Sequence, residues 1–345
     1  MTPFLQPTRG AGPGATGGAD LREPYARRVP ASTALKVAAI PLMLAGGAGV
    51  AVQSQINGRL AHELGGTTTA ALTSAVISFG TGLVLVAVIT LGSRERRAGI
   101  GRVATAVQEG HLPRAALLAG LLGAVLVASQ GITVATIGVA MFSVGLTAGQ
   151  SSAGLVVDQL GLGPGGQHRW NVSRLIAASF AVAAVALAAG ERLIGSFAWE
   201  TALFALLPLA AGAGAALQTA LNGRISHHGG PWVTSLNNFV VGFAGLVVVW
   251  LLCLVLDPRL ETPPTRWWLY LGGPIGLVFI WLAAVLVRVH GVLVLALCLI
   301  AGQVIGAEAI ELLGPEKHVG PLGIAAGGLV VLGVVVALAR RPSAT

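Results

Sequence analysis

The chain of 345 residues is 54% hydrophobic and only 10% charged, and it contains 49 glycines. A soluble domain needs a polar surface, so the long runs without Asp, Glu, Lys or Arg exclude that class of protein and predict membrane-spanning helices. The net charge of +8 does not indicate nucleic-acid binding. The arginines fall in loops, where membrane insertion requires them, and they form no basic stripe interleaved with aromatic residues. We therefore expect a lipid bilayer, and no nucleic acid, as a partner.

Residues 1–31 are rich in Gly, Pro and Arg, which predicts a disordered, basic cytoplasmic tail. Ten apolar segments follow, each close to the roughly 20 residues that span a bilayer as a helix. The third and fourth meet near Gly138, and the eighth and ninth meet at His290 and Gly291, so we expect two tight hairpins. The ten segments are 34–56, 67–91, 113–136, 138–158, 172–190, 201–222, 232–256, 267–289, 291–313 and 321–339.

One stretch of the sequence occurs twice. The residues GAGVAVQSQINGRLAH at 47–62 return as GAGAALQTALNGRISH at 212–227, with nine identical residue types 165 positions apart. A second block, 123–161, matches 276–314 at a spacing of 153 and carries the triplet Ala-Gly-Gln in both copies. We interpret the chain as two related halves, 34–190 and 201–339.

A longer loop in the first half, 92–113, explains why the spacing falls. Its apolar residues recur at helical intervals, and several arginines lie between them, which predicts a short amphipathic helix on the membrane surface. The apolar residues are Ile100, Val103, Ala104 and Val107, and the arginines are Arg94, Arg96, Arg97 and Arg102.

The charges predict the orientation of the chain. With the amino terminus in the cytoplasm, sixteen of the 21 Lys and Arg residues face the cytoplasm, so we expect both termini to be cytoplasmic. Each half has five helices, an odd number, so the halves must insert in opposite directions. The predicted fold is an all-α polytopic membrane protein with ten transmembrane helices in two inverted five-helix repeats. Inverted repeats recur in secondary transporters.

Four carboxamides are candidates for lining a substrate path. Gln53 and Gln218 lie inside the first helix of each half, one turn before Asn57 and Asn222, so each pair shares a helix face. A carboxamide in hydrocarbon must face protein or a water-filled cavity. Hydrogen bonding between helices is the alternative role. Asn-Gly is also typical of a helix end, which explains the two asparagines without a site.

Further candidates lie on the fourth helix of each half. Gln150 and Gln303 follow Ala-Gly in both copies, and we expect them to face the same central cavity or to form a packing notch. Glu308 is the proton-coupling candidate, because burial in the membrane would make a carboxylate protonatable. Asp158 and Glu311, at helix ends, are interpreted as solvated acids at the membrane surface.

The remaining residues of the repeated stretch have structural explanations. Arg59 and Arg224 are expected to anchor helix ends at the two membrane surfaces. Small residues let helices approach closely in membranes, which predicts a packing role for Gly47, Gly49, Gly212 and Gly214.

No metal site or catalytic motif is expected. His62, His227 and His228 lie in turns without acids or cysteines at ligand spacing, and Cys253 and Cys298 lie in apolar runs. The sequence contains no Walker loop, nucleophile elbow or HExxH motif. We therefore expect no cofactor and no enzymatic activity.

The duplicated motifs resemble a known family. The predicted arrangement of ten helices in two groups of five resembles that of the drug/metabolite transporter superfamily. The pattern G-x-G-x-x-x-Q-x-x-x-N-G-R, together with A-G-Q followed by an acidic residue, resembles its bacterial inner-membrane branch of YdcZ-type exporters, over about residues 38–339. The resemblance implies a substrate path between the halves near mid-membrane, and it names no substrate. Arg288 and Glu308 depart from the repeat, since Ala135 and Leu155 align with them.

Two functions are compatible with these observations. The first is a secondary transporter that exports a small polar or amphipathic metabolite by alternating access, driven by a proton gradient or by the substrate's own gradient. The second is a membrane-embedded assembly or lipid-handling protein without transport. We expect the chain in the bacterial inner membrane, with a small-molecule substrate as partner, and the sequence leaves a homodimer open.

Overall fold

The computed structural model describes residues 33–162 and 199–313, together with short helical pieces between 175 and 183 and between 321 and 332. All regular elements in these ranges are helical. The predicted tail 1–31 and the greater part of the fifth and tenth segments lie outside the described residues. The elements are α1 (Thr33–Glu63), α2 (Thr68–Leu91), α3 (Arg94–Gln108), the 3₁₀ helix η1 (Arg114–Leu118), α4 (Ala119–Gln159), α6 (Trp199–Gly229), α7 (Pro231–Leu256), the 3₁₀ helix η2 (Trp267–Tyr270) and α8 (Gly272–Leu313).

Four helices among the described residues are long and apolar enough to cross a membrane. They cover Ala39–Glu63, Thr68–Leu91, Arg114–Val139 and Pro231–Leu256. Two shorter apolar helices cover Met141–Val157 and Gly272–Ala283. The protein is therefore an all-α protein with membrane-spanning helices, as its composition predicts.

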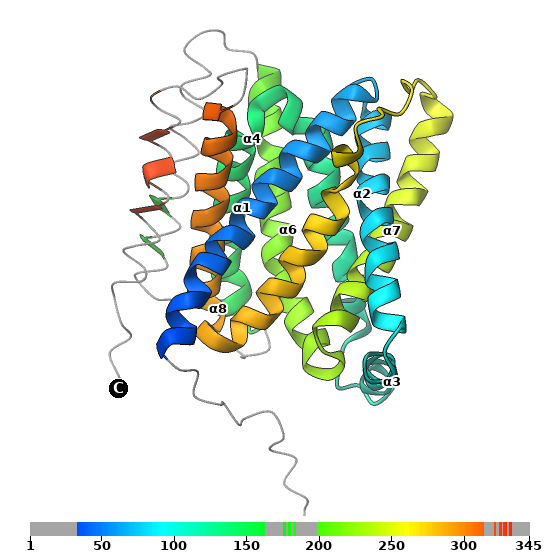
Figure 1. Ribbon diagram of the computed structural model, residues 1–345, viewed down its shortest axis with the longest axis vertical. Coiled ribbons are helices and arrows are strands. Elements are labelled where there is room, and N and C mark those ends of the chain that lie inside the picture. Colours follow the sequence, from blue (N-terminus) through cyan, green and yellow to red (C-terminus); the bar gives the residue numbers. More distant parts are fainter. Residues whose placement is uncertain are drawn as a thin grey trace, which may run out of the picture.

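The two longest elements, α4 and α8, each fold back on themselves. Gly138 breaks α4 with φ of 77°, a left-handed conformation that glycine adopts without strain. In α8, Leu282 and Leu299 both lie within 3.2 Å of the position that a Cβ on Gly46 would take. A straight helix would hold these two leucines about 25 Å apart. Figure 1 shows the second arm of α8 rising beside the first. The break in α4 lies at Gly138, where the first hairpin was predicted, and α8 turns back between Leu282 and Leu299, a range that contains the second predicted hairpin.

The long helices run along the length of one bundle (Figure 1). The α1–α2 turn and the segment 257–271 lie at one end, which we call the far end; Glu261 N–H donates to Leu64 O there at 3.0 Å. The α6–α7 turn and α3 lie at the opposite end, the α3 end, where Arg102 Nε donates to His228 O at 3.0 Å. The first helix of the first half and that of the second, α1 and α6, therefore run in opposite directions.

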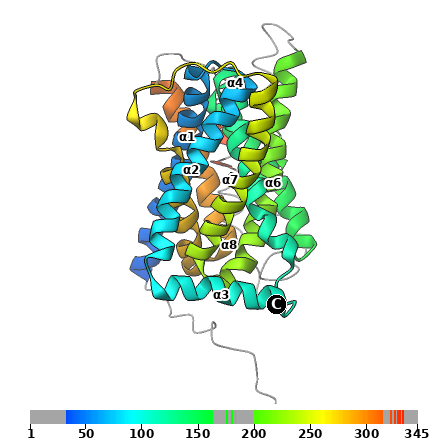
Figure 2. The ribbon, with the colours of Figure 1, turned by 90° about the vertical axis from the view of Figure 1, so that its right-hand side faces the viewer.

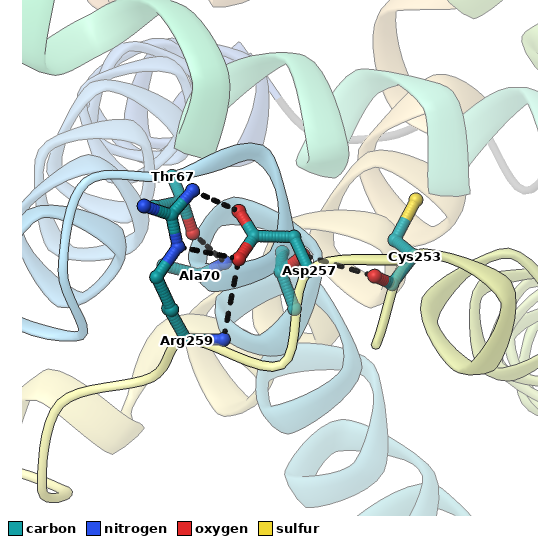
Figure 3. A network of polar contacts seen from close by, with 6 residues as sticks. Thr67, Ala70, Cys253, Asp257 and Arg259 are labelled. Carbon is teal, nitrogen blue, oxygen red and sulfur yellow. Dashed lines mark hydrogen bonds and ion pairs between the residues drawn. The ribbon is translucent and has the colours of Figure 1, made fainter. Parts of the chain in front are cut away.

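The far end is closed by short polar contacts (Figure 3). The Thr67 side chain accepts the N–H of Ala70 and caps α2, and Asp257 N–H donates to Cys253 O at the end of α7. The Asp257 carboxylate accepts Arg259 Nε at 2.7 Å and Nη2 at 3.2 Å. These hydrogen bonds hold the pKa of the Asp257 carboxyl below its usual value. A further hydrogen bond joins the two helices at this end, since Thr69 Oγ1 donates to Cys253 O at 3.4 Å.

The predicted amphipathic helix in the loop 92–113 is confirmed as α3, which lies across the end of the bundle (Figure 2). Its buried face packs on the α6–α7 turn through Gly99, Val103 and Ala106. Ile100 and Ala104 remain exposed on the same helix. Part of the apolar face predicted to lie on lipid therefore lies on protein instead.

Candidate functional site

Two backbone crossings join the halves of the chain. A Cβ on Gly47 would overlap Leu299 O, and a Cβ on Gly302, on the same arm of α8, would overlap Leu44 O. The second crossing repeats the first between α6 and α4: Gly212 lies against Leu146 O, and Gly149 against Leu209 O. Both crossings need glycine on both helices, which is how helices reach backbone contact in membranes.

The other two predicted packing glycines are less confined. A Cβ on Gly49 would lie 3.8 Å from Ile275, and one on Gly214 would lie 3.6 Å from Leu122. These are ordinary van der Waals distances. The close approach depends on the first glycine of each Gly-Ala-Gly, not on the second.

The glutamines Gln53 and Gln218 are packed against glycines that belong to the opposite half. Gln53 is 7% exposed, and its Nε2 lies 2.6 Å from the position of a Cβ on Gly276. Gln218 Nε2 lies 2.5 Å from the equivalent position on Gly123. A larger residue at either glycine would displace the carboxamide. Each glutamine therefore lies at the contact between the halves, where a substrate path was expected.

Asn57 takes part in a buried network within the first half. Its Nδ2 donates to Gln130 Oε1 at 2.6 Å, and Gln130 Nε2 donates to Ser54 Oγ at 3.0 Å. The Asn57 backbone carbonyl accepts Ser74 Oγ at 2.8 Å. Asn57 Oδ1 has no hydrogen-bond partner within the described residues. The side chain is 1% exposed and points toward Gly272.

Asn222 belongs to a different network in the second half. Asn238, on α7, donates from Nδ2 to Asn222 Oδ1 at 2.7 Å and to Thr234 O at 2.8 Å. Its Oδ1 accepts Gln218 Nε2 at 2.9 Å. One asparagine thus holds two of the predicted site residues.

The Asn-Gly pairs do not end helices, so that interpretation is wrong. Helix α1 continues through Gly58 to Glu63, and α6 continues through Gly223 to Gly229. Gly58 is needed for close packing, since a Cβ there would lie 2.7 Å from Val134 on α4. The asparagines are therefore interior helix residues.

Of the two glutamines in the Ala-Gly-Gln triplets, Gln303 is the more deeply buried. It is 3% exposed, and its Nε2 lacks a hydrogen-bond partner in the described part of the chain. Gln150 is half-buried. On the neighbouring turns of α4, the hydroxyls of Ser143 and Thr147 are also buried without a partner among the described residues. Buried polar groups of this kind are rare and call for an explanation.

Glu308 is half-buried near the end of α8. Its Cγ and Oε1 lie 3.3 Å from the position of a Cβ on Gly327, in the tenth apolar segment. The proton-coupling candidate thus faces that segment. Glu311, expected to be solvated, is 6% exposed, so that expectation is wrong: its side chain lies on the buried face of the last turn of α8, whereas Leu312 and Leu313 are exposed. The side chains of Asp158 and Arg288 lie outside the described residues.

The two arginines of the repeat occupy opposite ends of the bundle. Arg59 lies 5.5 Å over the Trp268 ring and 3.4 Å from Glu63 at the far end. Arg224 Nη2 donates to Gly161 O at 3.0 Å at the end of α4. Each contacts a neighbouring segment of the protein, and its role as an anchor at the membrane surface stays a prediction.

The sequence did not single out Gln130 or Asn238, on which both networks depend. A signal for Asn238 was present, because Phe79-x-x-Gly82 returns as Phe239-x-x-Gly242 at a spacing of 160. That alignment pairs Asn238 with Ser78. Gln130 aligns with Ala283 and has no repeat signal; its only mark is a carboxamide in an apolar run.

The described residues contain no group of three or more His, Cys, Asp or Glu side chains that could hold a metal ion. Both cysteines are free thiols. The arrangement is one of neutral hydrogen-bonding groups at contacts between apolar helices.

A family model described as "Putative inner membrane exporter, YdcZ" matches residues 38–187 and 203–336. No curated protein matches the chain.

Proposed function

We propose that this chain, which belongs to the YdcZ family of inner-membrane exporters, is a secondary transporter that moves a small polar or amphipathic metabolite by alternating access. The family is described by export and not by an enzymatic reaction. The apolar helices of the described residues agree with a membrane setting.

The proposed architecture is ten membrane-spanning helices in two inverted halves, 34–190 and 201–339. The two regions that match the family model fall one within each half. The crossing of Gly47 with Leu299 is repeated by that of Gly212 with Leu146, residues that the two sequence spacings pair with each other. Because equivalent helices run in opposite directions, exchanging the conformations of the halves would turn an inward-facing state into an outward-facing one. Cytoplasmic termini follow from the distribution of Lys and Arg.

Gln303 carries the proposal of a substrate site. A buried donor without a partner costs about 1–3 kcal/mol, and it is expected where a ligand supplies the missing acceptor. Gln303 lies one residue from the backbone crossing between α1 and α8, at the boundary of the two halves. We infer a substrate with a hydrogen-bond acceptor, bound by Gln303 and reached also by Gln53, Gln150 and Gln218.

Asn57 and Asn222 are proposed as members of two hydrogen-bond networks, one in each half, that break and re-form during transport. In this structure they are bonded differently: Asn57 to Gln130, and Asn222 to Asn238. The residues that bond them have no equivalent carboxamide in the other half. The bond of Asn57 to Gln130 and that of Asn222 to Asn238 would break in alternate states, so that each asparagine contacts substrate in one state.

Glu308 is proposed as the proton-coupling group, because a half-buried carboxylate facing the tenth segment could release its proton as that helix moves. Transport should then depend on pH in the wild type and lose that dependence in Glu308→Gln. A Glu308→Gln variant that keeps the wild-type pH profile would remove this residue from coupling.

The test begins with a ligand-stabilisation screen of the purified protein against a metabolite library, since a ligand that binds the folded state raises the unfolding temperature. A ligand that stabilises the wild type is then loaded into proteoliposomes, and its flux is measured. Gln303→Leu should stay folded and lose both stabilisation and flux. Gln108→Leu, the same change on the exposed face of α3, is the control.

Unchanged flux in Gln303→Leu, and in the double variant Gln53→Leu/Gln218→Leu, would exclude the proposed lining. No observation on the described residues favours the alternative, a protein without transport activity. A homodimer stays a prediction.

A further inference from the structure

A hollow of about 190 Å³ opens at the α3 end of the bundle, and none of its lining residues belongs to the candidate site. Figure 2 shows α3 lying across this end of the bundle. The wall of the hollow includes Arg96 and Arg102 from α3 and Pro231, Trp232 and Val233 from the start of α7. A Cβ on Gly99 would lie 2.5 Å from Gly229 O, so the glycine lets α3 dock closely beside the hollow.

The protein uses only some of the N–H donors of Arg96 and Arg102. Arg96 Nη1 donates to Ile89 O at 2.7 Å, and its guanidinium lies 5.1 Å over the Trp232 ring. Arg102 uses Nε to bond His228 O. A guanidinium has five N–H donors in a rigid fork. Each arginine is therefore positioned by the protein and retains donors for a ligand in the hollow.

The start of α7 adds further positive potential to the same wall. The helix begins after Gly230, which has φ of 83° and supplies no side-chain cap, and its first turn contains no acidic residue. The first amides of a helix have no partner within it, and they carry a partial positive charge. Pro231 at the first position has no N–H, so in α7 these amides begin at Trp232. Glu95 is the one acid in the wall of the hollow, and its side chain is exposed.

We propose that Arg96 and Arg102, in the hollow between α3 and the start of α7, bind a phosphate group. Two fixed guanidiniums beside a helix start match the negative charge and multiple acceptors of phosphate. Because α3 crosses the end of the bundle where the membrane surface is proposed, the phosphate could belong to an anionic phospholipid. The second source is free phosphate from the cytoplasm. The site is independent of the transport proposal and joins the end of α2 to the α6–α7 turn.

The test uses the full chain, purified in detergent. One arm adds phosphatidylglycerol or, for comparison, zwitterionic phosphatidylcholine, and measures bound lipid by native mass spectrometry. The other arm titrates inorganic phosphate against chloride at equal ionic strength and measures the unfolding temperature. Both arms compare the wild type with Arg96→Gln/Arg102→Gln. The matched control is Arg94→Gln/Arg97→Gln, which removes the same charge from the same helix outside the hollow.

Each arginine near a membrane surface contributes about 1 kcal/mol to binding an anionic lipid. The Arg96→Gln/Arg102→Gln variant should therefore bind at least about tenfold more weakly than wild type, with the control nearly unchanged. Loss in the phosphatidylglycerol arm assigns the site to lipid, and loss in the phosphate arm alone assigns it to free phosphate. Equal losses in both double variants, or no loss in either arm, would overturn the proposal. If the double variant does not fold, Arg102→Gln is compared with Arg94→Gln, since both side chains are exposed.

Discussion

Phe79 and Phe239 face each other in the middle of α2 and α7, with ring centroids 5.2 Å apart and planes tilted by 50°. They are 160 residues apart, and each ring packs on a glycine of the opposite helix: Phe239 on Gly82 and Phe79 on Gly242. The contact is thus reciprocal. The first half and the second half meet here through equivalent residues.

The Phe79–Phe239 pair should be energetically coupled. Phe79→Ala and Phe239→Ala should each lower the free energy of unfolding, by about 3 kcal/mol if the gap does not close. The double variant should lose about 1 kcal/mol less than the sum, because each single change already removes the ring–ring contact. Chemical denaturation in detergent measures the three values. Strict additivity would contradict a direct contact between the rings.

The two glycines of each Gly-Ala-Gly should respond oppositely to alanine. Gly47→Ala and Gly212→Ala place a methyl group into the backbone of α8 or α4, so both variants should fail to fold or unfold at much lower temperature. Gly49→Ala and Gly214→Ala meet only ordinary contacts and should be neutral or stabilised, by up to about 1 kcal/mol from helix propensity. Thermal unfolding of purified protein checks the contrast. Equal effects at both positions would mean that the two backbones are not in contact.

Asn238 should matter far more than Ser78, although the two occupy equivalent positions. Asn238→Ala leaves Gln218 and Asn222 without their bonds, which should cost about 1–3 kcal/mol of unfolding free energy. Ser78 Oγ is buried without a partner among the described residues, so Ser78→Ala should be neutral or stabilising. Denaturant titrations of the two variants make the comparison. A larger loss for Ser78→Ala would contradict the network.

Sequence alone predicted much of this fold, because its signals are strong and local. Apolar runs, Gly138 at a hairpin and the amphipathic α3 all depend on residues near each other in the chain. The end of α1 was predicted wrongly, because Asn57-Gly58 is a local turn signal that tertiary packing against Val134 overrides. A glycine at position 58 is compatible both with a turn and with close packing of two helices, so the residue type alone does not distinguish them.

The candidate site was less predictable than the fold. The repeat identified the glutamines and asparagines, but their partners differ between halves: Gln130 serves Asn57, and Asn238 serves Asn222. An asymmetric partner leaves no repeat signal. Whether Gln303 or Gln53 had a hydrogen-bond partner depended on distances across the bundle, which sequence spacing does not contain.

The α6–α7 turn should lose stability in acid. Burial, and then the charges of His227 and His111, hold the pKa of His228 below 6.5. The folded state thus binds this proton less readily than the unfolded chain. The contribution of neutral His228 to the free energy of unfolding is therefore complete above pH 6.5, and it is lost as pH falls through the lower pKa of the folded state. His228→Gln should flatten the pH dependence of the unfolding temperature below pH 6.5, and His227→Gln should raise the pKa of His228. A decline below pH 6.5 that is unchanged in His228→Gln would assign it to other groups.

Single cysteines at Ser93 and Leu260 test the proposed orientation, because these residues lie at the α3 end and the far end of the bundle. The background is Cys253→Ala/Cys298→Ala, which removes both free thiols. An impermeant maleimide added to intact cells should label Leu260→Cys, whose wild-type side chain is exposed, and should reach Ser93→Cys only after permeabilisation. The reverse pattern would invert the orientation that the arginines predict and leave the bundle intact. Labelling of both from outside would place the two ends on one side of the membrane, which ten alternating spans do not allow.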